Sequence, residues 1–497
     1  MITRQQMYSR MLGKDQLLYR ISEKLTAVPD GAEGCGKVTA LYVMAPVMCM
    51  YVAWVLREAC AAGIRRLYFL ARDGYSMYET ARIFCEKRKL PIECRYLYCS
   101  RYAWRRAEYH LLKEASLSYI CLGGIDVNFR KLMSRAGLTD EEGKEIAGLT
   151  GMEKDWETPL TYRRLKDLQI QLAACRPFME KMGEKSRNAY PSVAEYLKQE
   201  GLLEPVPWAL VDSGWTGSMQ KSLQHLLDSM GYQGKVQGYY FGMYEHPDGV
   251  EPAACHCWYF GPGTGLRRKA NFSNSLFECI YSSPEGMTEG YEKRGEVYCP
   301  VLEKPRNPNR EKILKTTDYL KRYAEALSRV PSEIQSEAPG KELPSGSTPN
   351  KNRKLTFALL KRFMGRPSPE EAGEFGSYIF CDDVTGEDSQ RVAAELTPEE
   401  IRENRFFGRV ACYLKRNGKR VRESAWLEGS IVRSGMPAAE LWHCTLCKYV
   451  LYFRKQMKHH MKRRHEVGRK ASKNRHEAGR KASKHKNEAG RKASKYK

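Results

Sequence analysis

The sequence predicts an α/β protein built on a mostly parallel, Rossmann-like sheet with helical insertions. Two observations predict this fold: residues 67–99 have the pattern strand, helix, strand, and residues 208–244 repeat it. Strand, helix and strand within about forty residues is the βαβ unit of a parallel sheet. The composition agrees, because 497 residues with 42% hydrophobic content can bury a sizeable core.

Residues 1–34 are expected to form a helical lead-in to an α/β domain at 35–295. Residues 38–56 carry no charge and are long enough to cross a bilayer. The segment contains Pro46 and leads directly into a strand at 67–71, which favours a core helix packed on the sheet over a membrane span. The 16 cysteines are scattered along the chain and the N-terminus has no cleavable signal pattern, which predicts a cytoplasmic protein.

Both βαβ units place an aspartate where a strand ends. Arg72, Asp73 and Gly74 follow the first strand, and Asp212 ends the strand that begins at Trp208. Open α/β sheets bind ligands beyond the carboxyl ends of their strands, where helix N-termini present free N–H groups. We therefore expect both aspartates at one edge of the sheet, on neighbouring strands. There they would be the catalytic carboxylates, or would hold sugar hydroxyls or Mg²⁺ around a phosphate-bearing ligand.

The turn after Asp212, in VDSGWTGSMQ, is rich in groups that bind phosphate. Gly214 and Gly217 permit close backbone approach, while Thr216 and Ser218 add hydroxyl donors to the N–H groups that open the helix. The alternative is a plain strand-to-helix turn in which Asp212 and Ser218 act as caps.

Neighbouring segments supply further candidates for ligand binding. Arg72 and Arg101 are suited to clamp a phosphate or pyrophosphate. Ser100 ends the second strand, and Glu278 in NSLFECIYSSPEG adds a carboxylate. The alternatives are a local ion pair between Arg72 and Asp73, a strand-end hydroxyl at Ser100 and a solvated helix face at Glu278.

The order of these pieces resembles type I phosphoribosyltransferases, in which an aliphatic strand ending in acidic residues precedes a Thr-Gly phosphate loop. Asp212 matches the first acid, and Thr216, Gly217 and Ser218 match the loop. Ser213 stands in place of the second acid. The resemblance implies phosphate binding, with a departure at the acidic pair that phosphoribosyl pyrophosphate would require.

Five segments between about 35 and 435 resemble an uncharacterised family encoded in bacterial surface-polysaccharide gene clusters: FLARDGYSMY, YLYCSRYAWRRA, LVDSGWTGSMQ, SLFECIYSSPEGMTEGY and ESAWLEGSIV. Members are often labelled haloacid-dehalogenase-like hydrolases. If Asp73 were such a nucleophile, Tyr75 would occupy the place of the acid/base aspartate, so phosphatase chemistry of this type lacks half of its groups. A glycosyl or phosphoribosyl-type transferase is the enzyme that fits better.

Residues 296–435 are expected to form a helical module with a disordered insertion at about 329–353. The insertion is rich in Pro, Ser and Glu and has almost nothing to bury. The module carries no recognisable catalytic cluster. Its expected role is to cover the sheet or to form a partner surface.

Residues 440–466 have the ligand spacing C-x₂-C-x₁₂-H-x₄-H of a ββα zinc finger. Trp442, Leu451 and Met457 stand where such a finger places its small hydrophobic core. Two thiolates that face two imidazoles one helical turn apart give tetrahedral Zn²⁺. The expected ligands are Cys444, Cys447, His460 and His465. The alternative is a basic helix with incidental cysteines.

Residues 467–497 are expected to be disordered basic repeats of an eleven-residue unit that begins EAGRKASK or EVGRKASK. Residues 448–497 hold 19 Lys and Arg against three Glu, which gives +16 of the chain's net +24. Such a tail binds nucleic acid or another polyanion by neutralising phosphates and releasing counterions. The alternative is that it only keeps the chain soluble.

Two functions from different classes fit these features. In one, the α/β domain binds or transfers a phosphorylated sugar or nucleotide, and the finger and basic tail contact nucleic acid. In the other, the protein is a non-catalytic, zinc-dependent nucleic-acid-binding or interaction protein whose α/β body is a scaffold.

Overall fold

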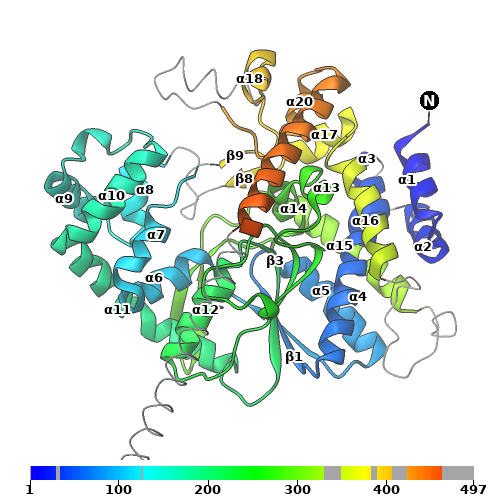
Figure 1. The fold of residues 1–497 in the computed structure, drawn as a ribbon. Helices are drawn as coiled ribbons and strands as arrows, with labels where there is room; N and C mark the ends of the chain where they lie inside the picture. The colour runs from blue at the N-terminus through cyan, green and yellow to red at the C-terminus, as the bar shows by residue number, and fades with distance from the viewer. Residues whose placement is uncertain are drawn as a thin grey trace, which may run out of the picture.

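The computed structural model describes residues 2–29, 34–124, 127–329, 349–381, 389–405 and 422–461, and a five-stranded sheet lies at its centre (Figure 1). Neighbouring strands of this sheet are all parallel and follow the order β2-β1-β3-β4-β5. The strands are β1 (Arg66–Leu70), β2 (Glu93–Leu97), β3 (Trp208–Trp215), β4 (Gly238–Met243) and β5 (Cys255–Phe260). The predicted parallel α/β fold is confirmed, and its strand order reverses between β1 and β3.

The two predicted βαβ units are present as β1–α5–β2 and β3–α12–β4, with α5 at Tyr75–Arg88 and α12 at Ser218–Ser229. Strand β3 is longer than predicted, because Trp215 pairs with Met243 and Gly214 with Gly242. Asp212 therefore lies inside the strand. Strand β5, CHCWYF, was not predicted from the sequence, since its Cys and His interrupt the apolar run that marks a buried strand.

Helices cover both faces of the sheet because successive strand residues point to opposite sides. Leu67 and Phe69 pack with α4 (Ala45–Ala61), α5 and α15 (Arg310–Ser328), whereas Tyr68 and Leu70 pack with α6 (Arg101–Leu112), α11 (Arg176–Gln199) and α12. The helical run Cys35–Ala61, which comprises α3 (Cys35–Thr39), a π-helical turn and α4, is apolar and long enough to span a membrane. Its most apolar 18-residue stretch is 89% buried inside the protein. The segment 38–56 is thus a core helix in this fold.

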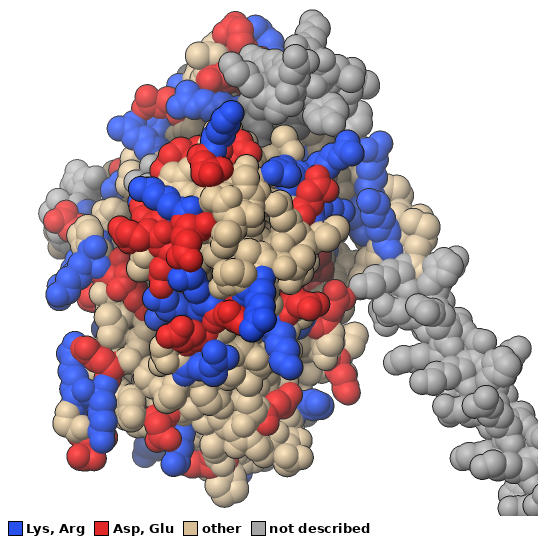
Figure 2. All heavy atoms as spheres, turned by 90° about the vertical axis from the view of Figure 1, so that its left-hand side faces the viewer, with Lys and Arg blue, Asp and Glu red and all other residues tan. Residues whose placement is uncertain are grey.

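The residues between β2 and β3 form a helical lobe, as the sequence predicted. Its helices pack with the start of α11 around a core of their own that includes Phe129, Ile146 and Leu168. On the face of the molecule that carries this lobe, basic and acidic side chains are interspersed (Figure 2). The lobe's own helices are α7 (Leu117–Ile120), α8 (Phe129–Arg135), α9 (Asp140–Thr150) and α10 (Tyr162–Ala174).

The predicted helical lead-in is present as α1 (Arg4–Leu12) and α2 (Gln16–Thr26). After the sheet, β6 (Thr288–Arg294) and β7 (Val297–Leu302) form an antiparallel hairpin that spans the expected boundary between the α/β domain and the helical module. Helix α16 begins at Pro349, inside the predicted disordered insertion, while residues 330–348 lie outside the described part. The remaining elements are α13 (Leu266–Ala270), α14 (Asn274–Tyr281), α16 (Pro349–Phe363), α17 (Pro369–Gly376), β8 (Ile379–Cys381), β9 (Ser389–Arg391), α18 (Pro398–Glu403) and α20 (Leu427–Arg433).

Residues 438–461 form one continuous helix, drawn orange to red in Figure 1, and the described part of the predicted finger contains no strand. Leu441, Cys444 and Lys448 recur at helical spacing on the side that meets the body. The first two are buried in a small apolar cluster, and the Lys448 ammonium donates to Glu428 at 2.6 Å. The described residues of this segment do not show the predicted ββα order, and the finger stays a prediction. His465 and the repeats at 467–497 lie outside the described residues.

Candidate functional site

The loop after β1 and the end of β3 meet at the carboxyl edge of the sheet. Strands β1 and β3 pair directly, and the Ser213 hydroxyl donates to Asp73 Oδ2 at 2.5 Å. Gly74 allows the loop to fold back onto the strand, because a Cβ there would lie 2.6 Å from the carbonyl oxygen of Leu70. The two strand ends that carry Asp73 and Asp212 are therefore neighbours at one edge, as the sequence predicted.

A third carboxylate joins the two aspartates from helix α14. The indole Nε1 of Trp215 donates to Glu278 Oε1 at 2.5 Å, and the charge of Asp73 acts on Glu278. All three carboxyl residues are half-buried at the sheet edge. Glu278 is therefore part of this site and does not lie on a solvated helix face.

The pKa values of the three carboxyls are raised. Burial raises the pKa of Asp212 to about 7 and that of Glu278 to about 8, and the neighbouring charge of Asp73 adds to both shifts. Burial also raises the pKa of Asp73, although the Ser213 hydrogen bond and two arginines act in the opposite direction. Groups that titrate near neutral pH are suited to donate or accept protons in a reaction.

Two arginines supply positive charge at the same edge. Arg72 precedes Asp73, and Arg101 is the exposed first residue of α6. Their charges lower the pKa of Asp73 and of Glu278, yet neither guanidinium forms a hydrogen bond or an ion pair with another described residue. The expected local pair between Arg72 and Asp73 is thus not a contact ion pair. Both guanidinium groups keep their donors for a ligand.

The turn from β3 to α12 has the backbone geometry that its glycines suggested. Gly214, Trp215 and Gly217 have positive φ values of 107°, 56° and 63°. Gly217 is the N-cap of α12, and no side chain caps this helix, so neither Asp212 nor Ser218 takes the capping role. The first-turn N–H groups of α12 consequently have no side-chain acceptor, which is the arrangement that favours an anion.

The hydroxyl-bearing candidates differ in how they are used. Ser100 caps α6, since its Oγ accepts from Ala103 N–H at 2.9 Å, and it donates to the Thr288 carbonyl at 2.5 Å. This is the strand-end role that the sequence left open. Thr216 is exposed and Ser218 half-buried at the start of α12, so both hydroxyls can be reached by a ligand.

Three residues that hydrogen-bond to the site escaped the sequence reasoning. Ser213 and Trp215 orient Asp73 and Glu278, and the buried Tyr51 hydroxyl donates to the carbonyl oxygens of Asp212 and Tyr239. The alternation of strand residues was the available signal for Ser213, because it places this side chain opposite to that of Asp212. The sequence contained no local signal for Tyr51, which reaches the site from the core helix α4.

The predicted zinc ligands that the structure describes do not lie close together. Cys444, Cys447 and His460 share one helix, and the thirteen residues from Cys447 to His460 correspond to about 20 Å along its axis. His465 lies outside the described residues. Among the described residues, no three His, Cys, Asp or Glu side chains form a group that could hold a metal ion, and this includes the Asp73 and Asp212 edge considered for Mg²⁺. Zinc and magnesium binding both stay predictions.

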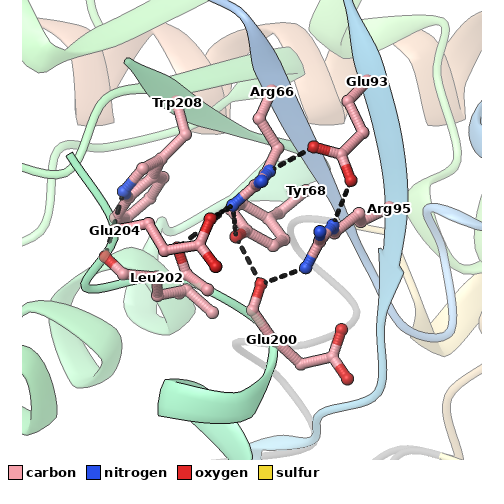
Figure 3. A network of polar contacts seen from close by, with 9 residues as sticks. Arg66, Tyr68, Glu93, Arg95, Glu200, Leu202, Glu204 and Trp208 are labelled. Atoms are coloured by element: carbon pink, nitrogen blue, oxygen red, sulfur yellow. Dashed lines mark hydrogen bonds and ion pairs between the residues drawn. The ribbon is translucent and has the colours of Figure 1, made fainter. Parts of the chain in front are cut away.

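The opposite, amino-terminal edge of the sheet has a different character (Figure 3). Arg66 is buried and forms ion pairs with Glu93 at 2.5 Å and with Glu204 at 2.7 Å. Its guanidinium also donates to the Tyr68 hydroxyl, which in turn donates to the Glu200 carbonyl oxygen at 2.6 Å. Burial acts to lower the pKa of Arg66, but the hydrogen bonds to Glu204 and Glu93 raise it overall. Here the buried charge is matched within the protein.

The carboxyl edge, by contrast, combines raised carboxyl pKa values, an uncapped helix and two arginines that form no hydrogen bond or ion pair with another described residue. It is the candidate functional site. In the comparisons with known proteins, no family model and no curated protein matches the chain.

Proposed function

We propose that the α/β domain binds a phosphorylated sugar or nucleotide at the carboxyl edge of the sheet and acts on it as a transferase. The observation that carries this proposal is the junction of β1 and β3. There the strand order reverses, and the Asp73 and Asp212 strand ends adjoin the glycine-rich turn and the uncapped start of α12. Ligands of doubly wound sheets bind at such switch points.

The proposed division of roles follows from charge. A phosphate group would sit on the turn from Gly214 to Ser218 and at the start of α12, with Arg72 and Arg101 as further donors. The carboxylates would face the sugar hydroxyls and the reacting atoms, because they would repel the phosphate. Asp212 and Glu278 have pKa values of about 7 and 8, so one of them can remove a proton from an attacking hydroxyl while another stays protonated.

A ligand screen tests this proposal on the full chain. Thermal unfolding would be followed with hexose phosphates, nucleoside monophosphates, nucleoside diphosphates and nucleoside-diphosphate sugars, each with and without Mg²⁺. We expect at least one class to raise Tm in a concentration-dependent way, because a ligand that binds only the folded state stabilises it. The raised Tm should disappear in Asp212→Asn.

The matched control is Asp228→Asn, which changes a carboxylate at the far end of α12 and should leave the ligand effect intact. No Tm shift with any phosphorylated class would contradict the proposal. A shift that survives in Asp212→Asn would move the binding site away from this edge.

We also propose that residues 440–466 bind Zn²⁺ and that the basic tail contacts nucleic acid. Besides the ligand spacing, one observation supports the finger. Trp442, Leu451 and Met457, the residues of its expected core, are 61%, 49% and 45% exposed on the helix at 438–461 and are not buried in the body. A finger fold would remove this apolar surface from water.

Metal analysis of the purified protein tests the zinc proposal. We expect one zinc per chain in the wild type and a clear loss in Cys447→Ser, with Cys299→Ser as the control for thiol content. DNA binding measured at two salt concentrations should weaken steeply with salt, since the tail neutralises phosphates. A chain purified with excess zinc that retains less than about 0.1 equivalents would overturn the finger.

A further inference from the structure

A buried arginine next to the proposed site, Arg105, contacts an aromatic ring but no carboxylate among the described residues. Arg105 lies one turn after Arg101 on α6 and is 6% exposed, and its Nε forms no hydrogen bond with any described residue. It forms no ion pair with a described residue either. Burying an ionised group without a partner is costly, so such a group is retained where something compensates it.

The groups around Arg105 add positive charge and a further donor. Its guanidinium lies over the ring of Tyr119 at 4.2 Å, and the ammonium of Lys221, on the first turn of α12, lies 6.0 Å from the same ring. The Tyr119 hydroxyl is buried and has no hydrogen-bond partner among the described residues. These groups therefore gather around the Tyr119 ring, beside the first turn of α12.

The charge of Glu108 acts on Arg105, but the two side chains do not form an ion pair. Glu108 is fully buried between α6 and α12, where it accepts from the Ser222 hydroxyl at 2.7 Å and from His225 Nδ1 at 2.9 Å. Its carboxylate is thus engaged by helix α12. Burial and the charge of Arg101 lower the pKa of Arg105, although the charge of Glu108 acts in the opposite direction. The charge of Arg101 also acts on all three carboxylates.

We propose that Arg105, Lys221 and Tyr119, with the start of α12, form a second phosphate subsite, so that the ligand of this domain carries more than one phosphate group. The inference deepens the proposed function and rests on it. Arg101 links the two subsites, with the carboxylates and the sugar on one side and the second phosphate between α6, α7 and α12 on the other. A nucleoside-diphosphate sugar or another diphosphate ester has this chemistry.

Pyrophosphate binding to the full chain tests the subsite. Calorimetric titrations at matched ionic strength would compare pyrophosphate with inorganic phosphate for the wild type and for Arg105→Met. We expect pyrophosphate to bind the wild type more tightly than phosphate does, and Arg105→Met to weaken pyrophosphate binding at least tenfold. Without ligand, Arg105→Met should keep or raise Tm, because it removes a buried charge that forms no ion pair with a described residue.

Two further variants keep the test decisive. Arg106→Met is the matched control on the same helix, since Arg106 lies over Tyr102 and should leave the affinity within twofold. Tyr119→Phe removes only the unpartnered hydroxyl and should weaken binding severalfold if the subsite uses it. An affinity within twofold of wild type in both Arg105→Met and Tyr119→Phe would overturn the inference.

Arg72→Met separates the subsite from the proposed function. If Arg72→Met loses pyrophosphate and Arg105→Met keeps it, the site at the strand ends stands and the second subsite falls. If Arg105→Met alone loses it, the subsite stands and the assignment of the strand-end loop to phosphate falls. A wild-type protein that binds no pyrophosphate, nucleotide or sugar phosphate overturns both.

Discussion

The two edges of the central sheet carry similar residues in opposite arrangements. At the amino edge, the buried charge of Arg66 is paired with two glutamates and shares hydrogen bonds with Tyr68. At the carboxyl edge, Asp212 and Glu278 have raised pKa values, and Arg72 has no hydrogen bond or ion pair with a described residue. At the amino edge the charged groups pair with one another. At the carboxyl edge the arginine donors are left for a ligand.

This difference separates stability from function within one sheet. Paired buried charges are expensive to break, so the amino edge holds the strands in register. Charged and polar side chains that bind a ligand lack hydrogen-bond or ion-pair partners when the ligand is absent. Such side chains lower the free energy of unfolding of the ligand-free protein. Substitutions at the amino edge should therefore lower stability, while some at the carboxyl edge should raise it.

The largest effect is expected at the amino edge. Arg66→Met should lower the free energy of unfolding by about 2–4 kcal/mol, because the ion pairs and the donors to Gly201 and Tyr68 are lost together. Urea unfolding at pH 7 measures this loss. The control is Arg176→Met, which removes an exposed ion pair with Glu180 and should cost less than about 1 kcal/mol. Equal effects of the two variants would abolish the contrast.

The next effect has the opposite sign. Glu278→Gln should raise the free energy of unfolding at pH 9 by ~1–3 kcal/mol and change it little at pH 4. The folded protein keeps the Glu278 proton up to a pKa of about 8, whereas the unfolded chain releases it near the usual value of 4.5. The folded state thus binds more protons within this window, and wild-type stability falls as pH rises through it. The amide keeps an oxygen that can accept from Trp215.

Unfolding curves at pH 4, 7 and 9 measure this prediction. The difference between Glu278→Gln and wild type should grow with pH. A difference that stays constant across the three values would show that the Glu278 carboxyl is not held protonated at the sheet edge.

The sequence was informative where the signal is local. The apolar runs LYFLA and WALVD identified β1 and β3, and the chemistry of strand ends brought Asp73 and Asp212 together correctly. What the sequence could not supply depends on contacts between distant segments. Glu278 lies on a helix that follows Asp212 by more than sixty residues. The sequence around Arg105 is that of an ordinary amphipathic helix, so it does not indicate that the guanidinium forms no ion pair. The contact of Leu441 and Cys444 with α20 is likewise a long-range packing contact that ligand spacing does not encode.

A smaller effect is expected from the hydroxyl that joins the two strand ends. Ser213→Ala should lower the free energy of unfolding by about 1 kcal/mol, the usual contribution of one hydrogen bond. It should also raise the pKa of Asp73, because the Ser213 hydrogen bond lowers it. Carboxyl NMR titration of Asp73 measures this shift. Ser218→Ala changes a serine five residues later, at the start of α12, and should leave the titration of Asp73 unchanged. A shift in Ser218→Ala in place of Ser213→Ala would contradict the hydrogen bond between Ser213 and Asp73.

The smallest change in stability is expected at Arg72, which follows the carboxyl end of β1 as Arg66 begins its amino end. Arg72→Met should alter the free energy of unfolding by less than about 0.5 kcal/mol at pH 7, because no contact ion pair with a described residue is lost. Its charge still lowers the pKa values of Asp73 and Glu278, so the variant should move both titrations to higher pH. Urea unfolding and carboxyl NMR, recorded on Arg72→Met and Arg66→Met side by side, measure the two quantities. A stability loss in Arg72→Met as large as that in Arg66→Met would mean that the carboxyl edge is a structural charge network too, and the case for a ligand there would lose its basis.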